Sequence, residues 1–160
     1  MQGKTPAVLF VCTANVCRSP MAAGLFKALL SSRVPGGGDW LVDSAGTWAS
    51  EGQRASENTI RVMQKRGIDL GHHRSKVVSK ALLNLFDLIL VMEPGHKEAL
   101  RVEFPEIAGR VWLLSELSGP AVPIEDPYGL SLEHYEKTAA EIEAYLQAGL
   151  PEILARVGYA

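Results

Sequence analysis

Cysteine is scarce in this sequence, and the two cysteines present do not form a structural set. Cys12 and Cys17 are the only ones in 160 residues, whereas a small domain held together by disulfides contains several pairs. The four histidines show no spacing typical of a closed zinc site, so no metal site is expected. A cysteine that serves neither a bridge nor a metal, and that stands near an arginine and a serine, indicates a reactive thiol.

The sequence also lacks a long apolar run and a strong charge of one sign. The longest apolar run, near residues 85–92, is far too short to cross a bilayer, and we expect no signal peptide ahead of the first apolar run. These features favour a cytoplasmic protein without a membrane partner. A formal net charge of −2 gives no reason to expect nucleic acid as a partner, and nothing in the sequence demands more than a monomer.

Short apolar runs alternate with amphipathic stretches along the whole chain, and we interpret residues 1–160 as a single domain. Wholly apolar runs predict strands that are buried on both faces. The predicted strands are residues 7–11, 40–44, 87–92 and 111–114. Helices are expected to start near residues 20, 56, 80, 94 and 131, the last one interrupted at residues 149–151. This alternation indicates an α/β fold with a parallel sheet and helices on both faces.

Residues suited to chemistry follow the predicted strands. Cys12, Ser44 and Glu93 each come after a strand, and so does a loop rich in Pro and Gly at residues 118–130. Because ligands bind beyond the carboxyl ends of parallel strands, we expect these residues at one edge of the sheet. A long ordered loop in a compact domain is often functional.

The segment from Cys12 to Pro20 combines a thiol, an arginine and the start of a helix. Ser19 is predicted to be the N-cap, with Pro20 at the first helical position. The turn and the helix N-terminus direct backbone N–H groups at one spot, and the Arg18 guanidinium fits two phosphoryl oxygens. An anion site of this kind favours the thiolate of Cys12, which can then attack phosphorus and form a phosphocysteine.

Phosphoryl transfer to a thiolate also requires a proton for the leaving group. Asp126, which precedes Pro127 in the loop at residues 118–130, is the natural candidate because that loop reaches the same edge of the sheet. We expect it to donate a proton to the leaving oxygen and then to take one from the water that hydrolyses the phosphocysteine. With Arg18 and the loop amides binding the equatorial oxygens, no metal is required.

These residues resemble a known family. The segment from Cys12 to Pro20 resembles the loop of the low-molecular-weight protein tyrosine phosphatases, and Asp126-Pro127-Tyr128 resembles their general-acid motif. Segments at residues 43–47, 67–70 and 87–92 resemble family segments in the same order. The resemblance implies a four-stranded parallel sheet of flavodoxin-like order. It also implies metal-independent hydrolysis of phosphotyrosine in proteins, with inorganic phosphate as product and no cofactor.

By position, the resemblance implies a role for each residue of the site. Cys12 is the expected nucleophile, Arg18 the phosphate ligand and Asp126 the acid. The residues expected to bind substrate are Thr13, Ala14, Asn15, Val16, Cys17, Trp48 and Tyr128. Those expected to support the loop by hydrogen bonds are Asn15, Ser19, Ser44 and one of His72 and His73, with His73 favoured.

Two positions depart from the family's pattern. Ala14 stands where Gly is usual, so the backbone there must avoid a conformation that only Gly tolerates. Gly129 stands where a second tyrosine is often found, so regulation through that tyrosine is absent. The resemblance also favours a reversible disulfide between Cys12 and Cys17 that protects the nucleophile from over-oxidation. The alternative is that Cys17 is a small filler.

Plainer interpretations of single residues stay open at this point. Cys12 can be a buried core cysteine, and Asp126 can merely cap a turn before Pro127. His96 and His134 are expected at the surface. Glu93 is assigned no role.

Three other activities use similar elements. Arsenate reduction needs further cysteines outside the loop in the branch that resembles this chain, and the sequence has none. Phosphoarginine hydrolysis occurs in a branch that tends to carry Thr at the position of Val16, and an apolar Val16 favours the flat ring of phosphotyrosine. A non-hydrolytic phosphocarrier is disfavoured by Asp126, because an acid–base residue shortens the life of a phosphocysteine.

Overall fold

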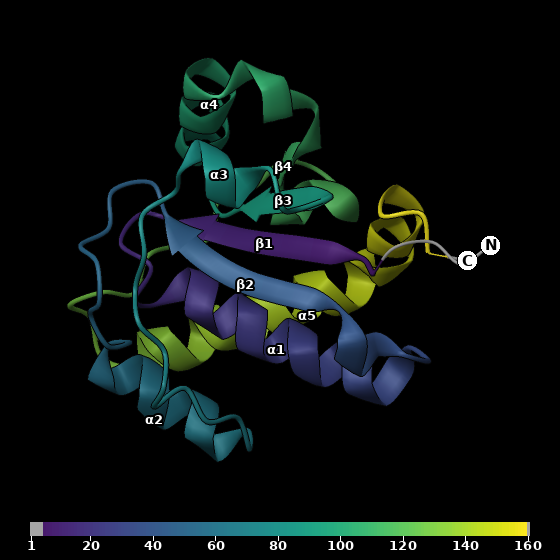
Figure 1. Cartoon of the computed structure of the whole chain (residues 1–160). Coiled ribbons are helices and arrows are strands. Elements are labelled where there is room, and N and C mark those ends of the chain that lie inside the picture. Colours follow the sequence, from purple (N-terminus) through teal and green to yellow (C-terminus); the bar gives the residue numbers. More distant parts are fainter. Residues whose placement is uncertain (1–4, 160) are drawn as a thin grey trace.

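Four parallel strands form the centre of the molecule (Figure 1). They are β1 (Ala7–Cys12), β2 (Leu41–Gly46), β3 (Leu88–Val91) and β4 (Val111–Leu113), in the order β2-β1-β3-β4. The computed structural model describes residues 5–159, and the ends of the predicted domain, residues 1–4 and 160, lie outside the described residues. The observed order is the predicted flavodoxin-like one, and the predicted α/β fold is confirmed.

The strand order makes the carboxyl end of β1 a favourable place for a ligand. The chain adds β2 on one side of β1 and then crosses over to add β3 on the other side. At such a switch point the connections leave the sheet in opposite directions and open a crevice beyond the strand end. Residues 13–17, here called the β1–α1 loop, enter this crevice directly from β1.

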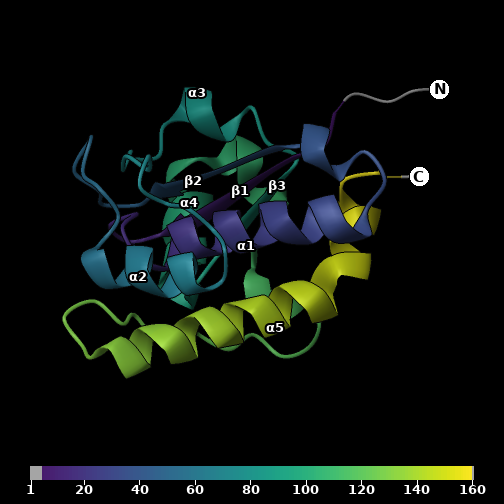
Figure 2. The same ribbon diagram turned by 90° about the horizontal axis from the view of Figure 1, so that it is seen from below.

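Helices cover both faces of the sheet, as predicted. On one face lie α1 (Arg18–Arg33) and α5 (Leu132–Arg156), and on the other lie α3 (Lys80–Leu83) and α4 (Pro94–Glu103) (Figure 1). A further helix, α2 (Glu57–Lys65), packs beside α1 and α5 and so belongs to their layer (Figure 2).

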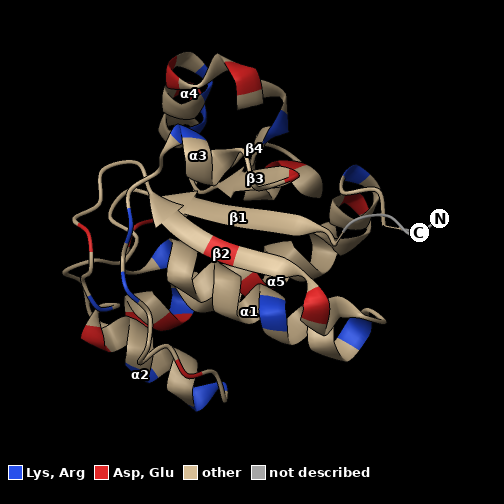
Figure 3. Cartoon of the chain, in the orientation of Figure 1, with Lys and Arg blue, Asp and Glu red and all other residues tan. Residues whose placement is uncertain are grey.

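Two hydrophobic cores, one on each face of the sheet, hold these layers together. All residues of β1 are buried, and alternate side chains enter the two cores. On the α1 side, the ring of Phe26 contacts both Phe10 and Trp40 edge to face, while Ile89 and Leu100 belong to the opposite core. β1 and β3 contain no charged residue (Figure 3), as expected of strands that are covered on both faces.

Two of the predicted helix ends are wrong. α1 begins one residue before Ser19 and has Cys17 as its N-cap, and the Ser19 hydroxyl is directed to the thiol of the preceding strand instead. α5 continues through Pro151 rather than being interrupted at residues 149–151. Leu150 and Ile153, on either side of the proline, are buried, and this packing outweighs the backbone hydrogen bond that proline cannot make.

The remaining connections include three short 3-10 helices, Gly37–Asp39, Pro105–Arg110 and Leu114–Leu117. Residues 118–131, here called the β4–α5 loop, have no regular structure. The N–H of Ile124 in this loop donates to the carbonyl of Met92 at 2.9 Å, which ties the loop to the end of β3. Of the helices within residues 5–159, none is long and apolar enough to cross a membrane.

Candidate active site

A cavity of about 270 Å³ lies beyond the carboxyl end of β1, at the switch point of the sheet. Its wall combines the β1–α1 loop with parts of two loops that are distant in the sequence. The lining residues are Cys12, Thr13, Ala14, Val16, Cys17, Arg18, Gln53, Asp126 and Tyr128. All of them except Gln53 belong to the site predicted from the sequence.

Cys12 is the last residue of β1, and its thiol lies at the cavity wall. The residue is almost fully buried, and its Sγ lies 3.0 Å from Oγ of Ser19 in the first turn of α1. The thiol therefore faces a hydroxyl and the N-terminal end of a helix. The free N–H groups and the dipole of that end favour a negative charge.

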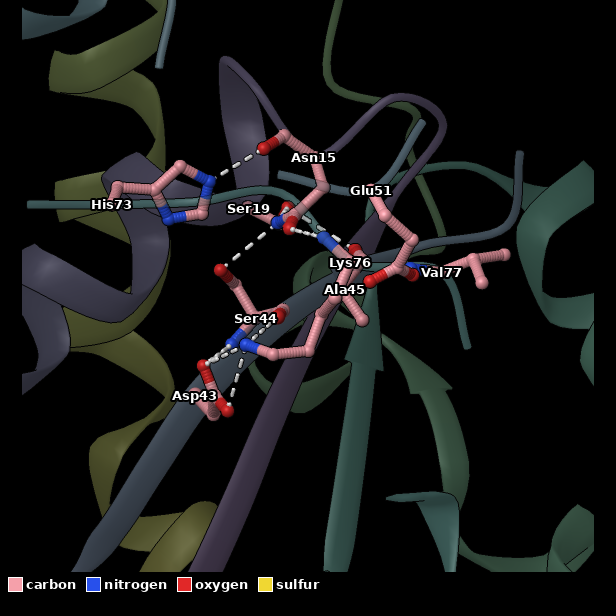
Figure 4. Close-up of polar contacts among 9 residues, drawn as sticks. All are labelled: Asn15, Ser19, Asp43, Ser44, Ala45, Glu51, His73, Lys76 and Val77. Atoms are coloured by element: carbon pink, nitrogen blue, oxygen red, sulfur yellow. Dashed lines mark hydrogen bonds and ion pairs between the residues drawn. The ribbon is translucent and has the colours of Figure 1, made fainter. Parts of the chain in front are cut away.

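Asn15 shapes the β1–α1 loop. With a φ of +61°, it is the only non-glycine residue of the described chain in the left-handed region, which asparagine tolerates better than most residues. Its side-chain amide donates to the hydroxyls of Ser19 at 2.8 Å and Ser44 at 2.9 Å (Figure 4). Asn15 is fully buried and does not line the cavity, so its side chain lies in the supporting network and not on the predicted substrate surface. Ala14 avoids the left-handed region, as predicted.

His73 closes this network from the far side of Asn15. Its Nε2 lies 2.7 Å from the Asn15 carbonyl oxygen (Figure 4), and because a carbonyl only accepts, Nε2 carries the proton. Burial lowers the pKa of His73 below its usual value, so the ring is neutral near pH 7. His72 is exposed, with its Nε2 4.0 Å from a carboxylate oxygen of Asp69, so of these two histidines it is His73 whose ring contacts Asn15.

Arg18 is buried beside the cavity although it carries a full charge. Its side chain is 1% exposed, its Nη1 forms an ion pair with Glu93, and the same atom donates to the Ile124 carbonyl at 2.7 Å. Its Nη2 lies 3.7 Å from a carboxylate oxygen of Asp126. Its Nε has no hydrogen-bond partner among the described residues. Glu93 and the Ile124 carbonyl thus hold Nη1 of the guanidinium, whereas its Nε can still donate a hydrogen bond to a ligand. No sequence pattern predicts this contact of Glu93.

Asp126 lies on a more open part of the wall. Its side chain is 47% exposed, and one carboxylate oxygen accepts from the Tyr128 N–H at 3.1 Å. Two residues earlier, the backbone of Ile124 is fixed by its bonds to Met92 and Arg18. The carboxylate of Asp126 therefore faces the cavity and is also accessible to bulk water.

His96 does not lie at the surface, and that prediction is wrong. The residue is 6% exposed, and its Nε2 lies 2.8 Å from Oγ1 of Thr13 in the cavity wall. Burial, together with the charge of Arg18, lowers the pKa of His96 to about 4, so the ring is neutral near pH 7. No local sequence signal marks this contact, because it arises when the N-terminal turn of α4 packs against the β1–α1 loop.

Cys17 shares the cavity wall with Cys12, and both are free thiols. Sγ of Cys17 lies 3.3 Å from Oγ of Ser56 and 3.8 Å from the hydroxyl oxygen of Tyr135. Burial raises the pKa of the Cys17 thiol above its usual value. The disulfide between the two cysteines stays a prediction.

The two aromatic residues expected to bind substrate differ in their positions. Tyr128 lines the cavity, whereas Trp48 does not and is 85% exposed. The Trp48 N–H donates to the Thr13 carbonyl at 2.9 Å, which ties the segment at residues 47–56, the β2–α2 loop, to the β1–α1 loop. The β2–α2 loop also supplies Gln53 to the wall. Gln53 was not predicted as a site residue, because it belongs to no recognisable sequence motif.

Comparison with known proteins relates this chain to one family. The family described as low molecular weight phosphotyrosine protein phosphatase matches residues 7–157. A probable low molecular weight protein-tyrosine-phosphatase, EpsP, of Ralstonia solanacearum is 36% identical over 148 residues, which cover 92% of this chain and 96% of the relative. A protein-arginine-phosphatase of Geobacillus stearothermophilus is 36% identical over 140 residues, which cover 87% of this chain and 90% of that relative.

Solved structures agree with this relationship. The low molecular weight protein tyrosine phosphatase from T. tengcongensis matches with a TM-score of 0.86 and 40% identity, over 92% of this chain and 99% of its own. The YwlE arginine phosphatase from Geobacillus stearothermophilus matches with a TM-score of 0.84 and 34% identity, over 94% of both chains. The chain belongs to the low molecular weight phosphotyrosine protein phosphatase family.

Proposed function

We propose that this protein removes phosphoryl groups from phosphotyrosine in proteins, without a metal ion. One observation carries the proposal: Cys12, Arg18 and Asp126 line the same cavity. A nucleophile, a fixed cation and a proton donor around one cavity are what the hydrolysis of a phosphate monoester requires. Phosphoproteins are then the substrates, and inorganic phosphate is the product.

The phosphoryl group binds between the β1–α1 loop and Arg18. The N–H groups of the loop and of the first turn of α1 suit the equatorial oxygens. The Nε of Arg18, which lacks a partner among the described residues, donates to one of these oxygens. Glu93 and the Ile124 carbonyl hold Nη1 and so keep the guanidinium from turning away.

In the first chemical step, the Cys12 thiolate attacks phosphorus. An S–P bond forms while the P–O bond to the tyrosine oxygen breaks, and Asp126 gives its proton to the departing phenoxide. Tyrosine leaves, and the phosphoryl group stays on Cys12 as a phosphocysteine. The charge that gathers on the equatorial oxygens is balanced by Arg18 and by the loop N–H groups.

In the second step, water attacks the phosphocysteine. Asp126, now ionised, takes a proton from the water, the S–P bond breaks, and inorganic phosphate forms. The Cys12 thiolate is the leaving group, and the Ser19 hydroxyl, 3.0 Å away, stabilises it by donating a hydrogen bond. The exposure of Asp126 suits this step because water must reach the carboxylate.

The apolar part of the wall supports an aromatic ester as substrate. Val16 and Tyr128 line the cavity, and Tyr128 is 66% exposed. Phosphoarginine is the second candidate, because a protein-arginine-phosphatase is as similar to this chain as a tyrosine phosphatase is. Arsenate reduction is less well supported because there is no third cysteine. A phosphocarrier role does not explain the position of Asp126.

Release of phosphate from phosphotyrosyl and phosphoarginyl peptides of one sequence tests the proposal, with and without a metal chelator. We expect kcat/KM for the phosphotyrosyl peptide to be higher by about tenfold or more, and the chelator to leave it unchanged. A faster reaction with the phosphoarginyl peptide would contradict the substrate preference. Loss of activity with the chelator would contradict the metal-independent mechanism.

We also infer a cytoplasmic location and a monomer. The mechanism depends on a free thiol at Cys12, which a reducing compartment preserves. The three proposed catalytic residues come from one chain, so the site needs no second copy. Cell fractionation and sedimentation are the measurements that check these points, and a periplasmic pool or an obligate dimer would contradict them.

A further inference from the structure

A short segment that begins at His73 joins three parts of the site. Residues 73–78, here called the strap, cross the carboxyl end of β2 and run beside the β1–α1 loop (Figure 4). The Gly46 N–H donates to the Lys76 carbonyl at 2.9 Å, and the Val78 N–H donates to the Gly46 carbonyl, also at 2.9 Å. These two backbone hydrogen bonds attach the strap to the end of β2 in the manner of a parallel strand.

Lys76 connects the strap to β2 and to Asn15. Its backbone N–H donates to Oδ1 of Asn15 at 3.0 Å (Figure 4). Its ammonium group contacts both carboxylate oxygens of Asp43, at 2.9 and 3.0 Å, and donates to the Ser44 carbonyl at 3.3 Å. Because these contacts fix the residue to β2, they also fix the backbone N–H that holds Asn15.

The strap also holds the part of the cavity wall that contains Gln53. The Ser75 N–H donates to the Gln53 carbonyl at 2.7 Å, and Oγ of Ser75 accepts from the Gln53 N–H at 2.9 Å. The Val77 N–H donates to the Glu51 carboxylate at 2.7 Å (Figure 4). A displacement of the strap therefore moves Gln53 and Asn15 together.

We propose that Lys76 is a positioning residue for phosphate binding and that Asp43 is its anchor. The inference rests on the proposed function and assigns to it a residue that lies outside the cavity wall. Asn15 keeps a left-handed conformation that few residues adopt without support. Ser19 and Ser44 bind its amide nitrogen, and Lys76 binds its amide oxygen. Without the Lys76 contact, the Asn15 amide is held only through its nitrogen, by Ser19 and Ser44, and the N–H groups of the β1–α1 loop are held less firmly in their common direction.

The Lys76–Asp43 ion pair is too exposed to contribute much to stability alone. Its side chains are 35% and 38% exposed, and pairs with such access to water add little to the free energy of unfolding. Lys97 also pairs with both carboxylate oxygens of Glu116, at 2.8 and 3.1 Å, in a pair that is less exposed, and it does not line the cavity. Lys97 is therefore a matched control for the loss of one paired ammonium group.

The experiment compares Lys76→Met, Lys76→Arg and Lys97→Met with the wild-type protein. For each we measure the inhibition constant of inorganic phosphate, kcat and KM with an aryl phosphate, and unfolding in urea. Lys76→Met is expected to weaken phosphate binding by about tenfold and to lower kcat by about fivefold. Lys76→Arg, which keeps the charge, is expected to stay within about twofold of the wild type. Lys97→Met is expected to change neither quantity by more than about twofold, although it lowers stability.

Asp43→Asn provides the same test from the other partner, because it removes the charge and keeps an acceptor for the Ser44 N–H. A Lys76→Met protein that loses stability but binds phosphate and turns over normally would overturn the inference. Equal losses in Lys97→Met would overturn it as well. An inactive wild-type protein would contradict the proposed function and this inference with it. An active wild type that is matched by Lys76→Met would contradict this inference alone.

Discussion

The two loops that meet at the cavity are built in opposite ways. Residues 15–17 of the β1–α1 loop are buried, as are Cys12 and Arg18 on either side of it, and the Asn15 side chain is hydrogen-bonded to β2, to α1 and to the strap. In the β4–α5 loop, Asp126 is half exposed, and the Ile124 backbone provides the main attachment to the rest of the site. One side of the cavity is therefore fixed by the protein interior, and the other side faces water.

This difference corresponds to two tasks that place different demands on a protein. Binding a doubly charged phosphoryl group requires donors that already point the right way, since turning them during the reaction costs free energy. Moving protons to a leaving group and from a water molecule requires a carboxyl group that water can reach. Under the proposed function, the buried side binds the phosphoryl group and the exposed side transfers the protons.

Cys12→Ser is expected to have the largest effect, because it removes the nucleophile from the buried side. We expect kcat/KM for an aryl phosphate to fall by at least about a thousandfold. The affinity for inorganic phosphate should stay within about tenfold, since Arg18 and the loop N–H groups remain. Steady-state kinetics and phosphate binding by calorimetry measure the two quantities. Turnover near that of the wild type would show that another group attacks phosphorus.

Asp126→Asn acts on the exposed side, and its effect depends on the leaving group. The amide keeps an acceptor for the Tyr128 N–H but cannot donate a proton to the ester oxygen as an acid does. We expect about a hundredfold loss of kcat with phenyl phosphate, and about tenfold or less with a nitrophenyl ester, which needs no acid. Equal losses with both esters would contradict the role of Asp126 as the acid.

A smaller effect concerns His96, which links α4 to Thr13. Its pKa of about 4 in the folded chain lies below the value in the unfolded chain, about 6.5. The unfolded chain therefore takes up the proton first, and stability falls as pH drops from about 6.5 towards 4. As the pH falls from 7.5 to 5, this histidine is expected to lower the free energy of unfolding by about 2 kcal/mol.

The measurement is the free energy of unfolding in urea at the two pH values. His96→Gln keeps a polar group near Thr13 but does not titrate, so the difference between pH 7.5 and 5 is expected to shrink. His134 is exposed, and His134→Gln is the control that leaves the difference as it is in the wild type. A full pH effect in His96→Gln would show that the buried imidazole is not its source. The lowered pKa of His73 acts in the same direction and accounts for part of what remains.

Local patterns were sufficient for the strands and for most of the cavity wall. The wholly apolar run that ends at Cys12 predicted a strand covered on both faces, and β1 is that strand. The spacing from this cysteine to Arg18 and the following helix predicted an anion site, because these residues lie close together in the chain. The parallel topology then brought Asp126 to the same edge, although it lies more than a hundred residues away.

Contacts made by packing could not be predicted in this way. The burial of His96 depends on how α4 sits over the β1–α1 loop, and the contact of Lys76 with Asn15 depends on the path of the strap. Pro151 carries a strong local signal for a helix end, but buried neighbours override it. Trp48, expected from the resemblance to bind substrate, does not line the cavity, and its side chain is exposed.

The central claim is that the buried side of the cavity binds the phosphoryl group and the exposed side transfers protons. Its most direct test is to trap the phosphocysteine intermediate on Cys12. Asp126→Asn protein is mixed with a nitrophenyl phosphate, quenched in acid within milliseconds, digested and examined by mass spectrometry. The account predicts one added phosphoryl group on the peptide that contains Cys12, together with a burst of nitrophenol, because the exposed side no longer activates water. Release of nitrophenol with no phosphoryl group on Cys12, or with the group on another residue, would contradict it.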